Sequence, residues 1–443
     1  MSKHLVWLGL VCLFCFGCKH EPLKGPNDQL LRERLDNMSP TGNSSYYIFP
    51  EANDFSSIPN QDDKNPINAE KAELGKMLFH ETGLAASPAY PIGESTYSCA
   101  TCHIASRGFT PGRAQGLADG GLGFAGNRHQ IAGYLGHEVD AQGARPLSVL
   151  NVAYVTNTLW SGTFGSFGIN EGTEALWHGH ENAEVNLEGL QGLEAQNIEG
   201  LELHRMEITD VVLDQFGYRE HFDRCFPDFP AEERYSHKTA SFAISAYLRT
   251  LLAQEAPFQK WLNGEDYAIT EQEKRGALLF LGKANCSSCH KGPSFNSMEF
   301  HALGTKDLYE QDEILNTDHE DNRNRGRAFF TDNAEDDFKF KVPQLYNLKD
   351  YTHFFHGSSK QTIREVVEYK LRAESENPYV AQDQLSSFFH PVEMSEDEIN
   401  DLVAFLENAL HDPDLERYVP ESVLSGNCIP NNDVFSRIEL DCD

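Results

Sequence analysis

Apolar residues recur at helical spacing in several separate stretches of the chain. In residues 69–80, AEKAELGKMLFH, the side chains of Leu74, Met77 and Leu78 fall on one helical face. A second stretch of this kind lies near residues 238–253, and a third follows residue 395. The face of the third stretch carries Ile399, Leu402, Val403, Leu406 and Leu410. No segment shows the alternation typical of strands, so the pattern predicts a mainly α-helical fold.

The helical pattern repeats together with a short cysteine motif. The string ELGKMLFHETG leads into SCATCH, and EKRGALLFLGKA leads into NCSSCH. Thr270 and Glu273 form a capping-box pattern before the second of these helices, and Ser395 and Glu398 form one before the last helix of the chain. The chain therefore contains two similar units, each a helix, a short link and a motif.

Two stretches between the helices show no apolar periodicity. Residues 112–144 are rich in glycine, and residues 161–193 are rich in Gly, Glu, Asn and aromatic residues. Loops of this length in a compact domain are usually functional or mobile. We expect both to be long irregular loops.

The C-x-x-C-H string is the attachment signal for c-type haem. Its two thiols add to the haem vinyl groups, and its histidine ligates the iron. A redox C-x-x-C pair does not need the histidine, and a zinc ribbon needs a second C-x-x-C about 15–20 residues on, which neither copy has. The motifs predict two covalently bound haem c groups. The attachment residues are Cys99, Cys102, His103, Cys286, Cys289 and His290.

The charge of the chain limits its partners. Its 443 residues include 36 Lys and Arg against 68 Asp and Glu, a formal net charge of −32. Nucleic acid and anionic membrane surfaces would be repelled. A basic protein, such as a small basic cytochrome, would be attracted. The acidity is also consistent with a protein that is simply kept soluble after export.

The N-terminus predicts export. Residues 1–18 have a short positive start, an apolar run too short to span a membrane, and FGC at the end, as in a bacterial lipoprotein signal. Cys18 would then be lipidated and anchor the protein in the periplasm, although ordinary signal cleavage is the alternative. Residues 19–65 are polar and predict a poorly structured tether. In an oxidising compartment Cys428 and Cys442 can form a disulfide.

Several separated strings make residues 66–412 similar to one protein family. The strings are ELGKMLF, SCATCH followed by RGFT, RPLSVLNVAY, LEAQ, NCSSCH, FKVPQLYNL, FFHGSSKQTIREVV and MSEDEINDLVAFL. The chain resembles the bacterial di-haem cytochrome c peroxidases, which include the MauG-like enzymes. The resemblance implies two cytochrome c-like haem domains facing each other, with long irregular loops. It implies a peroxidatic domain at 66–263, an electron-transfer domain at 264–412 and a tail at 413–443.

The resemblance implies different roles for the two irons. His103 would be the proximal ligand of the haem that reacts with peroxide, and His290 that of the haem that receives electrons. The family places a Gln in the distal pocket and a Glu ten residues later. LEAQ supplies Gln196, but Met206 stands at the tenth position, so Glu207, the next residue, is the acid that the resemblance implies. The other acid–base candidates are His204 and Glu202.

The resemblance also implies a tryptophan relay between the haems. Family members carry this Trp nine residues after a Leu-Asn pair, and here Leu150 and Asn151 are followed by Trp160 at that spacing. Its π-system would carry an electron between irons that are far apart. The alternative is a tryptophan that only packs in the core.

Two positions depart from the family pattern. The sixth ligand of the electron-transfer haem is usually a Met or Tyr, but here that position is Lys370, preceded by Tyr369. Either side chain is a candidate iron ligand, as is a five-coordinate site. Family members hold a calcium ion between the domains, and Tyr351 and His353 stand at two positions of that site here. Calcium could therefore be bound only through backbone carbonyls.

The expected function is that of a cytochrome c peroxidase, an oxidoreductase that reduces hydrogen peroxide to water. Its electrons would come from a small redox protein such as a cytochrome c. One alternative is a MauG-like enzyme that oxidises side chains of a partner protein. Another is a di-haem cytochrome that only transfers electrons.

Overall fold

The computed structural model describes residues 25–51, 53–180 and 182–442. The predicted signal sequence, residues 1–18, and the predicted lipidation site Cys18 lie outside these residues. Within the described part of the chain, no helix combines the length and the apolar character needed to cross a bilayer.

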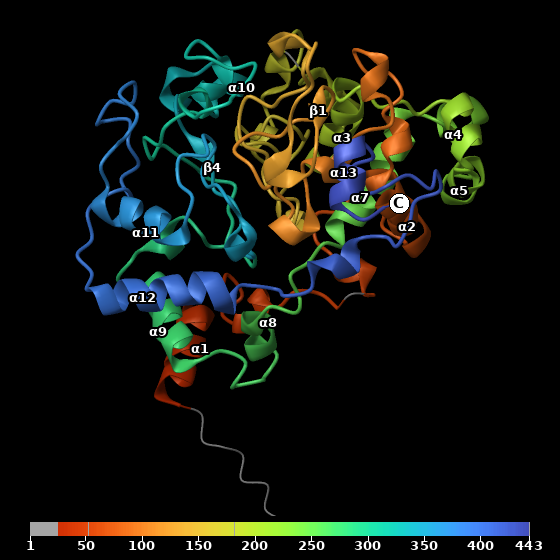
Figure 1. Ribbon diagram of the computed structural model, residues 1–443. Coiled ribbons are helices and arrows are strands. Elements are labelled where there is room, and N and C mark those ends of the chain that lie inside the picture. Colours follow the sequence, from red (N-terminus) through yellow and green to blue (C-terminus); the bar gives the residue numbers. More distant parts are fainter. Residues whose placement is uncertain (1–24, 52, 181, 443) are drawn as a thin grey trace, which may run out of the picture.

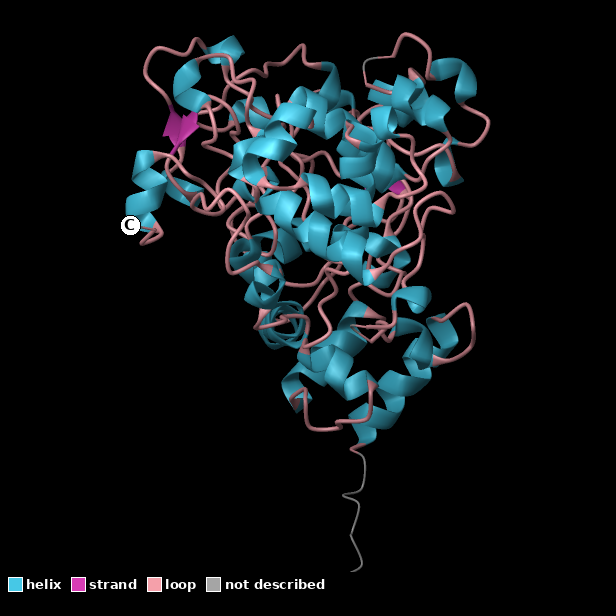
Figure 2. Ribbon diagram, turned by 90° about the vertical axis from the view of Figure 1, so that its right-hand side faces the viewer, coloured by secondary structure: helices cyan, strands magenta, loops and turns pink. Residues whose placement is uncertain are grey.

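Helices dominate the described residues, as the apolar pattern predicts. The strands in this part of the chain form two short antiparallel pairs. β1, Gly121–Leu122, pairs with β2, His129–Gln130, and β3, Phe300–His301, pairs with β4, Phe340–Lys341. Figure 2 shows helices throughout the molecule, joined by long loops. The prediction of a mainly helical fold is confirmed.

The longer helices gather in two lobes, which Figure 1 shows side by side. The first lobe contains α2, Ala69–His80, α3, Gly192–Leu203, and α7, His237–Arg249. The second lobe contains α9, Glu271–Phe280, α11, Ile363–Arg372, and α12, Glu396–Ala404. Each lobe thus holds one copy of the repeat seen in the sequence.

The other α-helices are short or lie near the ends of the chain. They are α1, Pro26–Met38, α4, Asp210–Phe216, α5, Arg219–Cys225, α6, Ala231–Arg234, α8, Pro257–Leu262, α10, Ala328–Thr331, and α13, Val434–Glu439. In their described residues, the predicted loops 112–144 and 161–193 contain short 3₁₀ turns and the β1–β2 pair, and α3 begins at the end of the second loop.

The helix-start signals of the sequence are confirmed. The Thr270 hydroxyl accepts a hydrogen bond from the Glu273 amide, while the Glu273 carboxylate accepts one from the Thr270 amide. Ser395 and Glu398 form the same reciprocal pair. These bonds satisfy amide groups that the first helical turn leaves free, and they fix where α9 and α12 begin.

In each lobe a glycine allows two helices to cross at backbone contact. A Cβ atom on Gly75 of α2 would lie 1.9 Å from the carbonyl oxygen of Ala243 in α7. A Cβ atom on Gly276 of α9 would lie 2.0 Å from the carbonyl oxygen of Asp401 in α12. Because Gly75 and Gly276 occupy the same place in the two repeats, both lobes are built on the same crossed helix pair.

The N-terminal arm is folded in its described residues, which corrects the prediction of a poorly structured tether at 19–65 from residue 25 onward; residues 19–24 lie outside the described residues. From Pro26 onward the arm forms α1, which packs against α9 and buries Leu31 and Leu35 completely. The Asp28 carboxylate lies 2.8 Å from the Lys274 ammonium group, and both side chains are only 4% exposed. The polar composition was misleading because a few apolar residues and one buried ion pair are enough to dock the arm.

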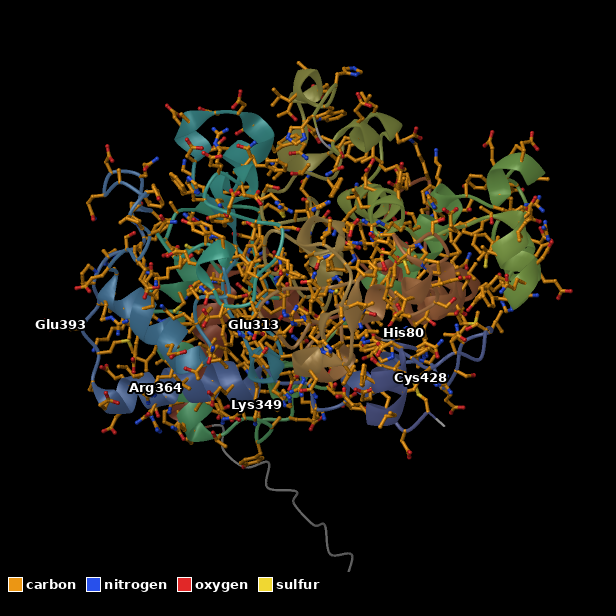
Figure 3. The ribbon with its side chains drawn as sticks, turned by 45° about the horizontal axis from the view of Figure 1, so that its top comes forward. His80, Glu313, Lys349, Arg364, Glu393 and Cys428 are labelled. Atoms are coloured by element: carbon orange, nitrogen blue, oxygen red, sulfur yellow. A yellow bond between two sulfur atoms is a disulfide. The ribbon has the colours of Figure 1, made fainter. Side chains whose placement is uncertain are left out.

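The C-terminal tail returns to the first lobe. The predicted disulfide between Cys428 and Cys442 is present. Figure 3 shows Cys428 on the side of the molecule that holds His80 of α2, away from Arg364 of α11. The tail therefore crosses from the second lobe, where it begins, to the first.

The contacts of the tail lie next to the first haem motif. The Thr101 hydroxyl, inside SCATCH, donates a hydrogen bond of 2.6 Å to the side-chain oxygen of Asn431. The Arg128 guanidinium pairs with Asp433 at 3.4 Å, and both side chains are 1% exposed. The tail thus ties together the motif and the Gly-rich loop.

We expect Asp28→Ala to destabilise the second lobe by about 3–5 kcal/mol, because it leaves the buried Lys274 ammonium group without its closest carboxylate. The matched control is Arg275→Ala, which removes an ion pair of Arg275 with Asp401 whose arginine side chain is 50% exposed. That pair should contribute no more than about 1 kcal/mol. Denaturant unfolding of the holoprotein measures both, and equal losses for the two variants would contradict the prediction.

Candidate functional site

The two haem motifs open into one cavity between the lobes. The cavity has a volume of about 880 Å³, and its wall is largely apolar. The cysteines and histidines of both motifs lie on it, as does Trp160. The structure therefore brings together sites that are far apart in the sequence, as a pair of cooperating cofactors requires.

The histidine of the first motif is oriented for ligation. Its Nδ1–H donates a hydrogen bond of 3.1 Å to the carbonyl oxygen of Phe109, so the lone pair of Nε2 is free. The ring of Phe79, the Phe of ELGKMLFH, lies 6.2 Å from the His103 ring. Desolvation lowers the pKa of His103 to about 4, which keeps the imidazole neutral, as an iron ligand must be.

The second motif repeats this arrangement. His290 donates from Nδ1 to the carbonyl oxygen of Phe295 at 2.6 Å, and the ring of Phe280 lies 6.3 Å from the imidazole. Desolvation lowers the pKa of His290 to about 4. Phe109 and Phe295 both have left-handed backbones, with φ of 59° and 53°, which turn their carbonyl groups toward the histidines. The sequence repeat is therefore also a repeat of the proximal site.

The surroundings of the motif thiols disfavour a redox pair. All four are free, and burial raises the pKa of Cys99, Cys102 and Cys286 to about 12. Reactive C-x-x-C pairs have lowered thiol pKa values instead. In the described residues, no group of three or more His, Cys, Asp or Glu side chains is placed to hold a metal ion, which also disfavours a zinc site.

Two buried cations fit the carboxylates of haem. Arg145 and Lys341 line the cavity, and each is 4% exposed. Neither has a carboxylate partner among the described residues; they donate to the carbonyl oxygens of Phe355 and Asn157, both at 2.8 Å. Burial lowers the pKa of Arg145 to about 10 and that of Lys341 to about 7. Buried unpaired charge is costly, so these side chains fit a cofactor that brings its own acidic propionates.

Trp160 lies where the two lobes meet. Its indole Nε1–H donates to the carbonyl oxygen of Arg145 at 2.7 Å. Its ring meets the edges of Phe340 and His356 of the second lobe, both with ring centres 6.3 Å away. Phe340 and His356 in turn stack at 3.6 Å. An indole from the first lobe is thus fixed against aromatic rings of the second.

The predicted distal residues separate into two groups. Gln196, His204 and Met206 line the cavity. Glu207 does not line it; its carboxylate accepts a hydrogen bond of 2.7 Å from the hydroxyl of Ser87. Glu202 is exposed and also lies off the cavity wall.

His204 has a carboxylate partner that the sequence did not predict. The Nδ1 atom of His204 lies 2.6 Å from the carboxylate of Asp140, an ion pair when the ring is protonated. Burial alone would lower the pKa of His204, but the charge and hydrogen bond of Asp140 outweigh it and raise the pKa. Asp140 comes from the Gly-rich loop, far from His204 in the sequence, and no spacing rule connects them.

Only one of the two candidate sixth ligands faces the cavity. One side of α11 lines it with Ile363, Val366, Val367, Lys370 and Leu371. The Lys370 ammonium group donates to the carbonyl oxygen of Phe388. Tyr369 is not on the cavity wall; it is buried, and its hydroxyl donates to the carbonyl oxygen of Leu303 at 2.6 Å.

The residues at the family's calcium position are engaged otherwise. The Tyr351 hydroxyl accepts a hydrogen bond of 2.8 Å from the Gln344 amide. His353 has its Nδ1 atom 2.9 Å from the hydroxyl of Thr352. The Arg145 guanidinium lies 5.6 Å from the Tyr351 ring, and its positive charge disfavours a calcium ion there.

Comparison with known proteins supports the same interpretation. Residues 69–267 match the family model described as di-haem cytochrome c peroxidase. The chain is 28% identical over 365 residues to the methylamine utilization protein MauG of Methylorubrum extorquens, covering 79% of this chain and 80% of that protein. It is 27% identical over 382 residues to the cytochrome-c peroxidase IdrP1 of Denitromonas iodatirespirans, covering 81% and 86%.

A solved structure shows the same fold. A MauG-like protein associated with microbial copper homeostasis superposes with a TM-score of 0.58 at 23% identity, covering 83% of this chain and 95% of that one. The resemblance found in the sequence strings is confirmed. Such a relationship implies two c-type haems, consistent with the motif geometry.

We expect the two motifs to bind haem independently. The double variant Cys99→Ser/Cys102→Ser should lose one covalent haem and keep the other, and Cys286→Ser/Cys289→Ser should do the reverse, because each pair of thiols supplies one set of thioether bonds. Intact mass and haem stoichiometry measure this. The control is Cys225→Ser, a half-buried cysteine away from the cavity, which should retain both haems. A wild-type protein that carries only one covalent haem would contradict the assignment.

Proposed function

From the premise that the chain is related to the di-haem cytochrome c peroxidases and MauG proteins, we propose that it reduces hydrogen peroxide to water with electrons from a small redox protein. The observation that carries the proposal is the shared cavity, which has an oriented histidine at each motif and Trp160 between the lobes. Similar proteins include a MauG protein and a cytochrome-c peroxidase.

The first lobe would hold the reacting site. When bound, a haem c with one free coordination position supplies the iron at which the O–O bond of peroxide is broken. His103 would ligate that iron through Nε2, and its bond to the Phe109 carbonyl fixes the ring. The Gln196 amide, on the cavity wall, would orient peroxide by hydrogen bonding. His204 lies on that wall, and Glu207 lies off it.

The second lobe would receive electrons. His290 would ligate its iron, and Lys370 is the polar side chain that α11 turns to the cavity. A neutral amine carries a lone pair that can complete a six-coordinate iron, which limits reorganisation during electron transfer. Trp160, fixed between the lobes, would relay the electron toward the first lobe.

A basic partner in the periplasm suits this site. The chain carries a formal net charge of −32, which attracts a basic electron donor and speeds its encounter. The lipoprotein-like signal ending at Cys18 supports export and a lipid anchor on the cell envelope.

A MauG-like activity is the second candidate. It is favoured by Lys370, which stands where the family usually has a Met or Tyr ligand, because the axial ligand sets the potential of the iron. A changed potential would let an oxidised state of the protein persist long enough to oxidise a side chain of a partner. The substrate would then be a protein rather than a reduced cytochrome.

Rapid mixing with hydrogen peroxide tests the proposed function. We expect the half-reduced holoprotein to react and then to turn over with a reduced basic cytochrome c, at a rate that falls with ionic strength because the charges are screened. A long-lived oxidant formed from the diferric protein without a donor would favour the MauG-like activity. An unchanged absorption spectrum in both redox states would contradict both and leave electron transfer alone.

We expect Lys370→Ala to convert the second ferric haem from low spin to high spin, because the variant removes the nitrogen ligand. Electron paramagnetic resonance of the oxidised holoprotein measures the change. Tyr369→Phe is the matched control from the adjacent position, and it should leave the spectrum unchanged because Tyr369 is not on the cavity wall and its hydroxyl donates to the carbonyl oxygen of Leu303. The ligand assignment is wrong if Tyr369→Phe alters the spin state or Lys370→Ala does not.

A further inference from the structure

A histidine–aspartate pair lies on the cavity wall of the first lobe. His204 follows α3 directly, and its Nδ1 atom lies 2.6 Å from the Asp140 carboxylate. Since the carboxylate only accepts hydrogen bonds when ionised, Nδ1 is the donor and Nε2 is the nitrogen left to act on a substrate. The Tyr97 hydroxyl donates to the carbonyl oxygen of His204 at 2.8 Å and fixes the main chain there.

The Gly-rich loop holds Asp140 in place. The Asp140 amide donates to the carbonyl oxygen of Asp119, and the Asp140 carbonyl accepts from the Ala118 amide, both at 2.9 Å. Asp119 is fully buried and pairs with Arg205, the neighbour of His204. The loop and the turn after α3 are therefore joined by two adjacent carboxylate contacts, which set the position of the pair.

The pair faces both the cavity and the solvent. His204 lines the cavity, yet its side chain is 37% exposed, while that of Asp140 is 13% exposed. A group in this position can exchange a proton with water outside and pass it inward. The exposed fraction therefore fits a proton carrier better than a group buried only for packing.

The expected carboxylate is not in position to do this. Met206, at the family's spacing from Gln196, presents a thioether to the cavity and carries no proton. Glu207 is bonded to Ser87 away from the wall. Among the described residues from 192 to 207, His204 is the only titratable side chain on the cavity wall.

We propose that His204, oriented by Asp140, transfers the proton in peroxide cleavage in place of a distal glutamate; this rests on the proposed peroxidase function. Nε2 takes the proton of the inner peroxide oxygen and gives it to the outer oxygen. The outer oxygen then leaves as water with the electron pair of the O–O bond. In the balanced reaction, two electrons from the donor protein and two protons from solvent convert the hydrogen peroxide to two molecules of water.

The charges around His204 suit this role. Burial opposes its protonation, and Arg205 does so as well, but Asp140 outweighs both and raises the pKa of His204. His103 is the other titratable ring nearby, and it is neutral. A histidine held between opposing charges in this way can act as a general acid–base group.

Stopped-flow mixing of the holoprotein with hydrogen peroxide gives the first test. We expect His204→Gln to slow O–O cleavage by a factor of about 10²–10⁴, the usual contribution of a general acid–base group. Asp140→Asn should have a smaller effect and shift the pH profile to lower pH, because the raised pKa of His204 depends on the carboxylate. The control is His221→Gln, a histidine of α5 that lies off the cavity wall and should react as the wild type does.

Cyanide association with the ferric protein gives a readout independent of turnover. Hydrogen cyanide must lose its proton to a base beside the iron before it binds. In the wild type the association rate should fall as the pH drops and His204 becomes protonated. In His204→Gln this dependence should disappear, and the rate at neutral pH should fall.

Two results would overturn the proposal. One is a normal peroxide rate in His204→Gln together with a large loss in Glu207→Gln, which would return the role to the glutamate. The other is a low-spin first haem that becomes high spin in His204→Gln, which would make His204 an iron ligand. If the wild type ignores peroxide but its cyanide binding depends on His204, the peroxidase function fails while the histidine's role as a base stands.

Discussion

The hydrogen bond from each motif histidine to a main-chain carbonyl is the constraint on which the site depends. Phe109 and Phe295 take left-handed conformations to present these carbonyls. The bond fixes the tautomer, so the nitrogen that faces the cavity is the one with a free lone pair. Without this hydrogen bond, a buried neutral imidazole has no preferred orientation. The crossed helices would then enclose an apolar cavity that has no oriented iron ligand.

The cavity between the lobes has apolar walls with a few polar groups at defined places. Arg145 and Lys341 bring positive charge to its inner wall, Lys370 brings an amine, and the His204–Asp140 pair stands at its margin. Each of these groups is buried or half-buried and held by carbonyl or carboxylate oxygens. Electrostatic interactions are strong in such surroundings, so small changes in these side chains have large effects on bound cofactors.

The parts of this structure that sequence could predict are those set by local rules. The helices of the two repeats, the capping boxes of Thr270 and Ser395, and the oriented motifs all follow from residues within one or two turns. The disulfide of the tail was also predictable, because Cys428 and Cys442 both lie in the tail and export brings them into an oxidising compartment.

What escaped prediction depends on contacts between distant segments. The arm that buries Leu31 and Leu35 has a polar composition, and its apolar surface is completed by α9. Asp140 contacts His204 because of the path that an irregular loop takes, and no sequence pattern predicts that path. The sequence could not show whether Lys370 or Tyr369 is the iron ligand, because the two residues are adjacent in α11. Only the structure shows that Lys370 lines the cavity and that Tyr369 does not.

The two ends of the chain are exchanged between the lobes: the N-terminal arm completes the second lobe, and the C-terminal tail completes the first. Asp28 and Lys274 are 246 residues apart, and Thr101 and Asn431 are 330 apart. Neither lobe is therefore a self-sufficient fragment, and cutting the chain between residues 263 and 264 would strip each half of its brace. An excised first lobe would have to carry the last thirty or so residues grafted onto it, and contacts of such long range make assembly of the whole intrinsically slow.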